Sequence, residues 1–70
     1  MEVFEYIFTP DDSEGRPADA PLIICAKTIE DAIQILFLRE LAERGVAGTI
    51  RVRRWRCGGR WIAKRYVPDR

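Results

Sequence analysis

The chain has 70 residues, of which 47% are hydrophobic and 33% charged, and a formal net charge of +1. This length allows one domain, and the composition is that of a globular protein rather than of a disordered tail or a membrane segment. The longest runs without a charged residue, such as Ala32 to Leu38, are too short to span a bilayer, and the first residues lack the basic start of a signal peptide. We therefore expect one domain over residues 1–70, in the cytoplasm.

The first third of the chain contains two predicted strands. Residues 3–8 alternate so that Phe4, Tyr6 and Phe8 share one side of an extended strand. Residues 9–21 combine proline, glycine and acids without an apolar period, which predicts an acidic loop. The short apolar run at residues 22–27 predicts a second strand, at the centre of the sheet.

A helix is predicted to begin after Thr28, which with Asp31 resembles a capping box, and to stop at Gly45. Apolar residues at helical spacing predict a stripe that covers a sheet: Ile29, Ala32, Ile33, Leu36 and Phe37. A second apolar set lies on another side of the helix: Ile35, Leu38, Leu41 and Ala42. We expect this second side either to pack within the domain or to form a homodimer seam or a groove for a partner.

The C-terminal part predicts a β-hairpin. Residues 48–56 alternate and then break phase, so either a β-bulge keeps Trp55 and Cys57 inward or the strand shows Trp55 to solvent. Gly58 and Gly59 predict a tight turn before a last strand over residues 60–67. The order ββαββ predicts an α+β fold in which one helix packs on one face of a four-stranded antiparallel sheet.

The residue inventory argues against catalysis. There is no histidine, no Gly-x-Ser-x-Gly and no phosphate-cradling glycine loop, and Cys25 and Cys57 lie far apart in the sequence. We expect a protein that is not an enzyme and uses no cofactor or metal. The two cysteines are expected to be small buried hydrophobes, with a disulfide only if their strands are neighbours.

Charge is divided unevenly along the chain. Residues 1–50 contain 4 basic and 10 acidic residues, whereas the last twenty contain 8 basic residues and 1 acidic one. Arginine dominates the basic segment, and its guanidinium binds phosphate or carboxylate through two hydrogen bonds and stacks on aromatic rings. This asymmetry predicts a dipolar molecule with one basic surface.

Arginines and tryptophans are interleaved in the hairpin, which is typical of a binding surface. The predicted partner-binding residues are Arg51, Arg53, Arg54, Trp55, Arg56, Arg60, Lys64 and Arg65. The cations suit nucleic-acid phosphates while the rings stack on bases, but the same residue types are enriched where proteins bind acidic protein surfaces. The alternative is a purely structural role, in which the tryptophans fill the core and the arginines only keep an edge of the sheet soluble.

Three short segments carry a resemblance to a known family: Ala26 to Ala32 at the helix entry, Gly48 to Val52 in the third strand, and Arg60 to Lys64 in the last. Their order is similar to that in small phage-encoded anti-CRISPR proteins that act on type I surveillance complexes. The resemblance implies a stoichiometric inhibitor that occludes the path of target DNA and can hold DNA nonspecifically. It places Arg51, Lys64 and Arg60 on the contact surface.

We therefore predict a phage or mobile-element inhibitor in the bacterial cytoplasm that binds a type I CRISPR–Cas ribonucleoprotein complex and blocks target DNA hybridisation. The alternative is a free-standing nucleic-acid-binding module with no protein target. A purely structural role would instead make the second apolar side of the helix the important surface. The inhibitor hypothesis requires the cationic side chains to protrude together from one outer surface, because side chains paired internally with the N-terminal acids leave no docking face.

Overall fold

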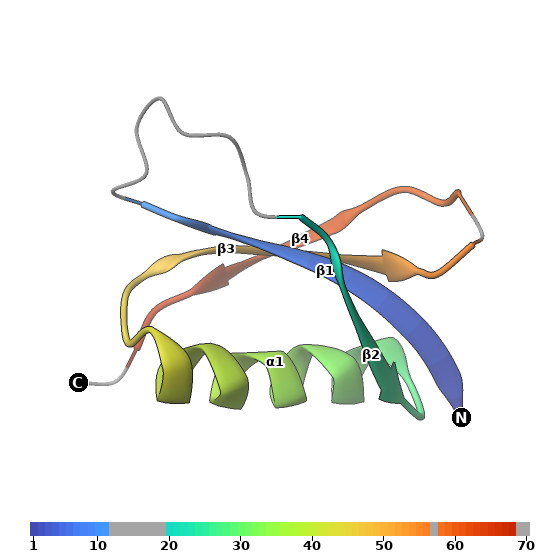
Figure 1. The fold of residues 1–70 in the computed structure, drawn as a ribbon, viewed down its shortest axis with the longest axis horizontal. Coiled ribbons are helices and arrows are strands. Elements are labelled where there is room, and N and C mark those ends of the chain that lie inside the picture. Colours follow the sequence, from blue (N-terminus) through green and yellow to red (C-terminus); the bar gives the residue numbers. More distant parts are fainter. Residues whose placement is uncertain (12–19, 57, 69–70) are drawn as a thin grey trace.

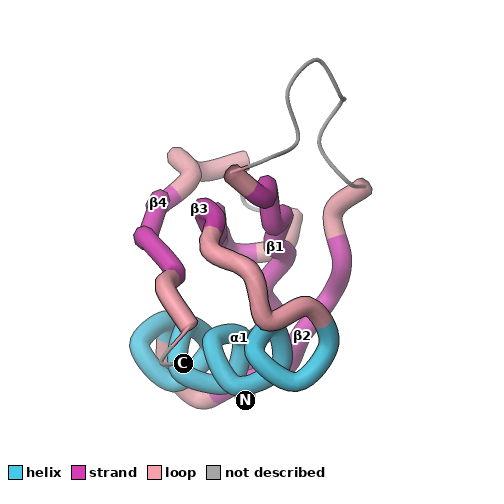
Figure 2. The backbone as a smooth tube through the Cα atoms, turned by 90° about the vertical axis from the view of Figure 1, so that its left-hand side faces the viewer, coloured by secondary structure: helices cyan, strands magenta, loops and turns pink. Residues whose placement is uncertain are grey.

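The chain folds into one antiparallel sheet covered on one face by a helix (Figures 1 and 2). The computed structural model describes residues 1–11, 20–56 and 58–68. The elements are β1 (Glu2–Pro10), β2 (Leu22–Ala26), α1 (Ile29–Glu43), β3 (Gly48–Arg54) and β4 (Ile62–Tyr66). The sheet order is β2-β1-β3-β4, with every neighbouring pair antiparallel. The predicted α+β ββαββ fold is confirmed.

The core lies between the helix and the two central strands. Phe4, Tyr6 and Phe8 are each at most 2% exposed, as the alternation in β1 predicted. In the neighbouring strand, Val52 lies opposite Tyr6 and Ile50 lies opposite Phe8, and both are fully buried. Directly opposed residues of an antiparallel pair point to the same face, so the register of β1 and β3 determines the helix-covered face.

The second strand lies at an edge, so the prediction that it is central was wrong. β2 pairs only with β1, and its Leu22, Ile23 and Cys25 are exposed. A short apolar run is typical of a strand buried on both faces, but it does not determine the number of neighbouring strands. The expectation of a buried thiol was also wrong for Cys25, which is free and exposed. Cys57 lies outside the described residues.

The helix follows its sequence signals closely. The backbone N–H of Asp31 donates to Thr28 Oγ1 at 3.1 Å, and Gly45 adopts φ +64° directly after the Arg44 C-cap. Ala32 and Leu36 are fully buried, and the other members of the stripe pack against the core. The second apolar side does not pack within the domain: Ile35, Leu38 and Leu41 are 43%, 63% and 45% exposed.

The start of β3 requires glycine because the neighbouring strand approaches closely. A Cβ atom at Gly48 would lie 2.5 Å from the Thr9 carbonyl oxygen and 2.6 Å from the Phe8 ring. The Phe8 ring in turn meets Tyr66 edge-on, with 6.0 Å between centroids. Gly48 thus lets the large rings at this end of the sheet close over the core.

The hairpin resolves one alternative and corrects one prediction. β3 ends at Arg54, and Trp55 is 38% exposed, so the strand shows Trp55 to solvent rather than bulging to bury it. The connection spans residues 55–61, which is wider than the predicted tight turn. Arg56 and Gly58 both take left-handed φ values, 67° and 59°, which lets the chain reverse over this longer path. Among the described residues, no helix is long and apolar enough to cross a bilayer.

Candidate partner-binding surface

The structure distributes the predicted partner-binding residues over two faces of the sheet and the hairpin end. Arg51, Arg53 and Arg65 alternate with inward residues and lie on the open face, which no helix covers. Arg54 and Lys64 share the face of their register partners Phe4 and Ile50, which is the helix-covered one. The β3–β4 connection carries the remaining three: Trp55, Arg56 and Arg60.

On the open face, Arg53 is held between an acid and an aromatic ring. Its register partner in β1 is Glu5, and Arg53 Nε lies 2.8 Å from Glu5 Oε2. The guanidinium also stacks over the half-buried Trp61 ring, 4.3 Å from the centroid. Because the Glu5 side chain is only 13% exposed, this cross-strand pair is partly desolvated and fixes the arginine in place.

Two more of the predicted cations are paired with N-terminal acids. Arg65 makes a two-pronged contact with Asp11, with N–O distances of 2.6 and 2.5 Å, and these hydrogen bonds hold the pKa of the Asp11 carboxyl below its usual value. Arg54 Nε lies 3.0 Å from Glu2 Oε1. Both pairs are well exposed to solvent and are therefore screened and weak.

The continuous cationic surface required by the inhibitor hypothesis is therefore not what the structure shows. Arg53, Arg54 and Arg65 are each neutralised by an acid from the N-terminal segment, and the eight residues do not share one face. Within the described part of the chain, the predicted cations without an ion pair are Arg51, Arg56, Arg60 and Lys64. Arg51 instead donates a hydrogen bond to Thr9 Oγ1 at 3.3 Å. The sequence did not reveal these pairings, because they depend on the register of β1 with β3 and on the path of the chain at Asp11.

A hollow of about 320 Å³ lies where the hairpin meets the start of the helix. We call it the hairpin hollow, and its lining residues are Ile29, Arg53, Arg54, Gly59, Arg60 and Ile62. Its volume is within the range of small ligand sites. Isoleucines from α1 and β4 supply apolar surface. Arg60 supplies a positive charge that has no ion pair among the described residues, whereas Arg53 and Arg54 are already paired with Glu5 and Glu2. The hollow therefore fits an anionic group carried on an apolar or extended chain.

The exposed tip of the hairpin presents a second guanidinium on an aromatic ring. Arg56 lies over the Trp55 ring, 4.2 Å from its centroid. The Trp55 backbone N–H donates to the Val3 carbonyl at 3.0 Å, which extends the β1–β3 pairing and anchors the base of the connection. The stacked pair is thus presented on a fixed strand end rather than on a free loop.

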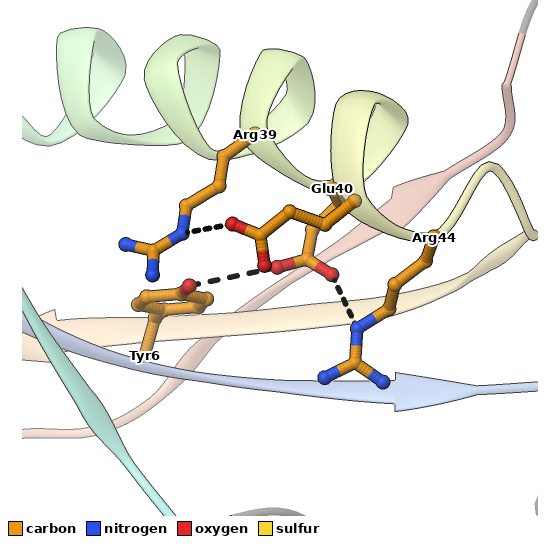
Figure 3. Close-up of polar contacts among 5 residues, drawn as sticks. Tyr6, Arg39, Glu40 and Arg44 are labelled. Atoms are coloured by element: carbon orange, nitrogen blue, oxygen red, sulfur yellow. Dashed lines mark hydrogen bonds and ion pairs between the residues drawn. The ribbon is translucent and has the colours of Figure 1, made fainter.

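The structure also contains a buried acid that the sequence analysis missed (Figure 3). Glu40 is 2% exposed, Arg44 Nε lies 2.9 Å from its Oε1, and the Tyr6 hydroxyl donates a long hydrogen bond of 3.5 Å to its Oε2. Burial raises the pKa of the Glu40 carboxyl, although Arg44 opposes the shift, and burial also raises the pKa of Tyr6. The helical spacing could have revealed it, because Glu40 follows Leu36 by four positions and so continues the buried stripe.

Glu40, Tyr6, Arg39 and Arg44 form a cluster that stabilises the fold and does not line a binding site. Arg44 lies over the Phe8 ring and Arg39 over the Tyr6 ring, at 5.1 and 5.8 Å from the centroids. Glu40 lines neither the hairpin hollow nor the groove between α1 and the end of β2. A carboxyl with a perturbed pKa is a candidate for catalysis where a substrate can reach it, and these contacts enclose it instead.

The fold and the hollow define the class of molecule: an α+β domain with one helix-covered face, one open face of mixed charge and an arginine-lined hollow at the hairpin end. No protein-family model matches the chain, and neither the curated proteins nor the solved structures gave a match.

Proposed function

We propose that the protein is a non-enzymatic binding protein that holds an acidic protein surface at the hairpin hollow. The observation that carries the proposal is the meeting of Arg54 and Arg60 with the apolar Ile29 and Ile62 around one hollow. Glu2 holds Arg54 through Nε, so the terminal nitrogens of that guanidinium can still donate to a carboxylate of a partner. Arg60 has no ion pair within the described residues and supplies charge that the fold does not use.

The interleaved acids favour a protein surface over a continuous nucleic-acid backbone. A phosphate chain crossing the open face would meet the carboxylates of Glu5 and Asp11 beside Arg53 and Arg65. Repulsion between the phosphates and these carboxylates disfavours binding of a nucleic acid. A protein partner with both acidic and basic groups can instead complement the alternating charges of the open face. The mixed-charge face is thus better suited to contacts around a docked protein than to a track for DNA.

Inhibition of a type I CRISPR–Cas ribonucleoprotein complex is the particular form of this proposal that the resemblance of residues 26–65 implies. The protein would dock on the guide-RNA complex and prevent hybridisation of target DNA. The form expected from the sequence, which docks through one broad cationic face, is given up because Arg53, Arg54 and Arg65 are paired with N-terminal acids. Only docking through the hairpin end is proposed. This form is therefore narrower than the one expected from the sequence.

Charge reversal at the hollow tests the proposal. The double variant Arg54→Glu/Arg60→Glu should abolish co-elution with a purified type I complex in the presence of nuclease, and should restore target DNA binding by that complex. The single variants Arg60→Glu and Lys27→Glu each reverse one charge on an exposed residue, but only Arg60 lines the hollow, so Arg60→Glu should weaken binding and Lys27→Glu should not. Circular dichroism checks that each variant folds. If Lys27→Glu weakens binding as much as Arg60→Glu, the hollow is not the site, and if the natural protein does not co-elute, the inhibitor form is wrong.

A second function, a nucleic-acid-binding module with no protein target, is favoured by the four predicted cations that have no ion pair among the described residues and by the exposed Trp55. Four phosphate contacts predict a log–log salt slope of about −3 to −4 for naked duplex DNA. A fluorescence anisotropy titration at several salt concentrations measures this slope. Affinity for naked DNA with this slope, together with no co-elution, supports the module over the inhibitor.

A further inference from the structure

The outward side of α1 carries more apolar surface than one sheet contact needs. Ala32 and Leu36 already bury the inner side, yet Ile35, Leu38 and Leu41 remain 43–63% exposed on the outer part. A helix that covers a single sheet is normally polar on its opposite side. An apolar outer side on so small a chain indicates that something packs against it.

A groove of about 450 Å³ lies beside this surface, next to the N-terminal half of the helix. One wall is formed by the chain start and the end of β2, through Met1, Cys25 and Ala26, and the other by Ile35 and Leu38 of α1. Figure 1 shows the N-terminus and the end of β2 close to the start of the helix. The groove and the outer side of α1 therefore form one apolar surface, which we call the helix seam.

The spacing of the helix seam fits another copy of the same helix. Asp31, Ile35, Leu38 and Ala42 follow one another at intervals of four, three and four residues. This is the spacing of the contact positions in paired helices. About a two-fold axis between residues 35 and 38, Ile35 of one copy meets Leu38 of the other in an antiparallel pair.

The charges of the seam also favour a second copy over a charged macromolecule. Glu30 and Asp31 lie in the first turn of α1, whereas Arg39 lies in its second half, where its Nε pairs with Glu43 and its side chain is 41% exposed. Antiparallel pairing brings Asp31 of each copy to the Arg39 end of the other, where the terminal nitrogens of that guanidinium can donate to it, whereas parallel pairing would place the two acidic first turns side by side. The groove itself contains one cation, Lys27, and one acid, Asp31, so it offers no net charge to a nucleic acid or to an acidic peptide.

We propose that the protein forms an antiparallel homodimer through the helix seam, in which Leu38 of each copy packs against Ile35 and the groove of the other. A standard interface buries about 800 Å² per partner. That area is about a sixth of the 4899 Å² surface of the chain, so the interface has to cover most of the side of the molecule on which the helix seam lies. The hairpin hollow stays free in this arrangement, and the dimer does not depend on the function proposed above.

Sedimentation velocity over a range of protein concentrations tests the dimer. The natural chain should change from monomer to dimer as its concentration rises into the range of about 1–100 μM, which is typical of a modest interface. Leu38→Glu should stay monomeric throughout, while Val67→Glu should dimerise like the natural chain. These two residues are matched because both are 63% exposed, but only Leu38 lies on the seam. A natural chain that is monomeric throughout, or equal behaviour of the two variants, overturns the proposal.

Cross-linking tests the orientation of the pair. In chains with Cys25→Ser and Cys57→Ser, an Asp31→Cys chain mixed with an Ala42→Cys chain should form the mixed disulfide under mild oxidation. In an antiparallel pair, residues 31 and 42 of different copies are adjacent, whereas two copies of residue 31 are about 16 Å apart along the axis. Predominant 31–31 cross-links would instead show parallel helices and overturn the antiparallel arrangement. Circular dichroism checks that the substituted chains fold.

Discussion

The two faces of the sheet show how one alternating strand serves two different purposes. On the helix-covered face, β1 contributes Phe4, Tyr6 and Phe8 to a core that excludes water. On the open face, the same strand contributes Glu5, which pairs with Arg53 of β3. Apolar burial on the helix-covered face therefore stabilises this small domain, while the charges of the open face mainly hold one another in position. Substitutions on the two faces should therefore differ strongly in their effect on stability.

The largest difference should come from neighbouring residues of β1 that point to opposite faces. Phe8→Ala should lower the free energy of unfolding by about 3–5 kcal/mol, because it empties a fully packed position beside Ile50 and Tyr66. Ile7→Ala, on the half-buried open face, should lower it by only about 1 kcal/mol. Urea denaturation followed by circular dichroism measures both values, and equal losses would mean that the open face is also covered.

A loss of that size would remove much of the stability of a domain of 70 residues. Small domains bury only about 60% of the surface that their unfolded chains expose, so their stability is marginal. Phe8→Ala is therefore expected to be largely unfolded at 37 °C, while Ile7→Ala stays folded.

A smaller effect should come from the charge pair on the open face. Arg53→Glu places two carboxylates directly opposite each other and leaves the poorly exposed Glu5 without its partner, so it should destabilise the fold by about 1–2 kcal/mol. Exchanging both residues, Glu5→Arg/Arg53→Glu, should recover part of this loss. Arg60→Glu, on an exposed residue outside the strands, should change stability by no more than about 0.5 kcal/mol. Thermal unfolding of these three variants and the natural chain separates a structural arginine from a free one.

These expectations differ from what the sequence alone predicts for the arginines. The sequence alone places Arg53 and Arg60 in one set of partner-binding residues and does not distinguish them. The structure separates Arg53, which is tied to Glu5 and Trp61, from Arg60, which is not. A failure of the charge exchange to recover stability would show that the Trp61 contact, rather than the ion pair, holds Arg53.

The sequence predicted the elements well because their signals are local. The Thr28 cap, the Gly45 stop and the alternation of β1 depend on neighbours within a few positions, and each was found where expected. The edge position of β2 could not be predicted, because strand order depends on long-range pairing that a short apolar run does not encode. The width of the hairpin connection likewise depends on where the pairing of β3 with β4 stops.

The candidate site was predicted only as a set of residue types. The arginines and tryptophans do lie at the hairpin, but the face on which each side chain lies depends on the register of the strands. A shift of the register by one residue would move every side chain of the strand to the other face. Their neutralisation by Glu2, Glu5 and Asp11 joins residues more than forty positions apart. The hairpin hollow forms where the start of α1 lies beside β4, and the sequence does not encode this contact. The hollow brings three of these cations together: Arg53, Arg54 and Arg60.

The smallest expected effect concerns pH and separates the buried acid from the exposed one. Burial raises the pKa of Glu40 in the folded protein, so its contribution to stability is fully present below the unfolded value of about 4.3 and is lost as the pH rises through the folded value. Arg65 lowers the pKa of Asp11, so that contribution is present above about 3.9 and is lost as the pH falls through the folded value. Stability should therefore rise from pH 7 toward mildly acidic pH and then fall.

Glu40→Gln should remove the rise and keep the fall, because glutamine reproduces the neutral form of the buried side chain but cannot titrate. Glu30→Gln is the control at an exposed acid in the first turn of the same helix, and this variant should keep the rise. Glu43 is unsuitable as a control, because its charge contributes to the raised pKa of Glu40. The urea midpoint measured between pH 7 and pH 3 gives both profiles. A natural chain whose midpoint falls steadily over this whole range would mean that Arg44 and Tyr6 compensate the buried charge fully. A Glu40→Gln variant that still shows the rise would mean that another group causes it. The buried acid would then no longer differ from the exposed pairs in how it responds to protons.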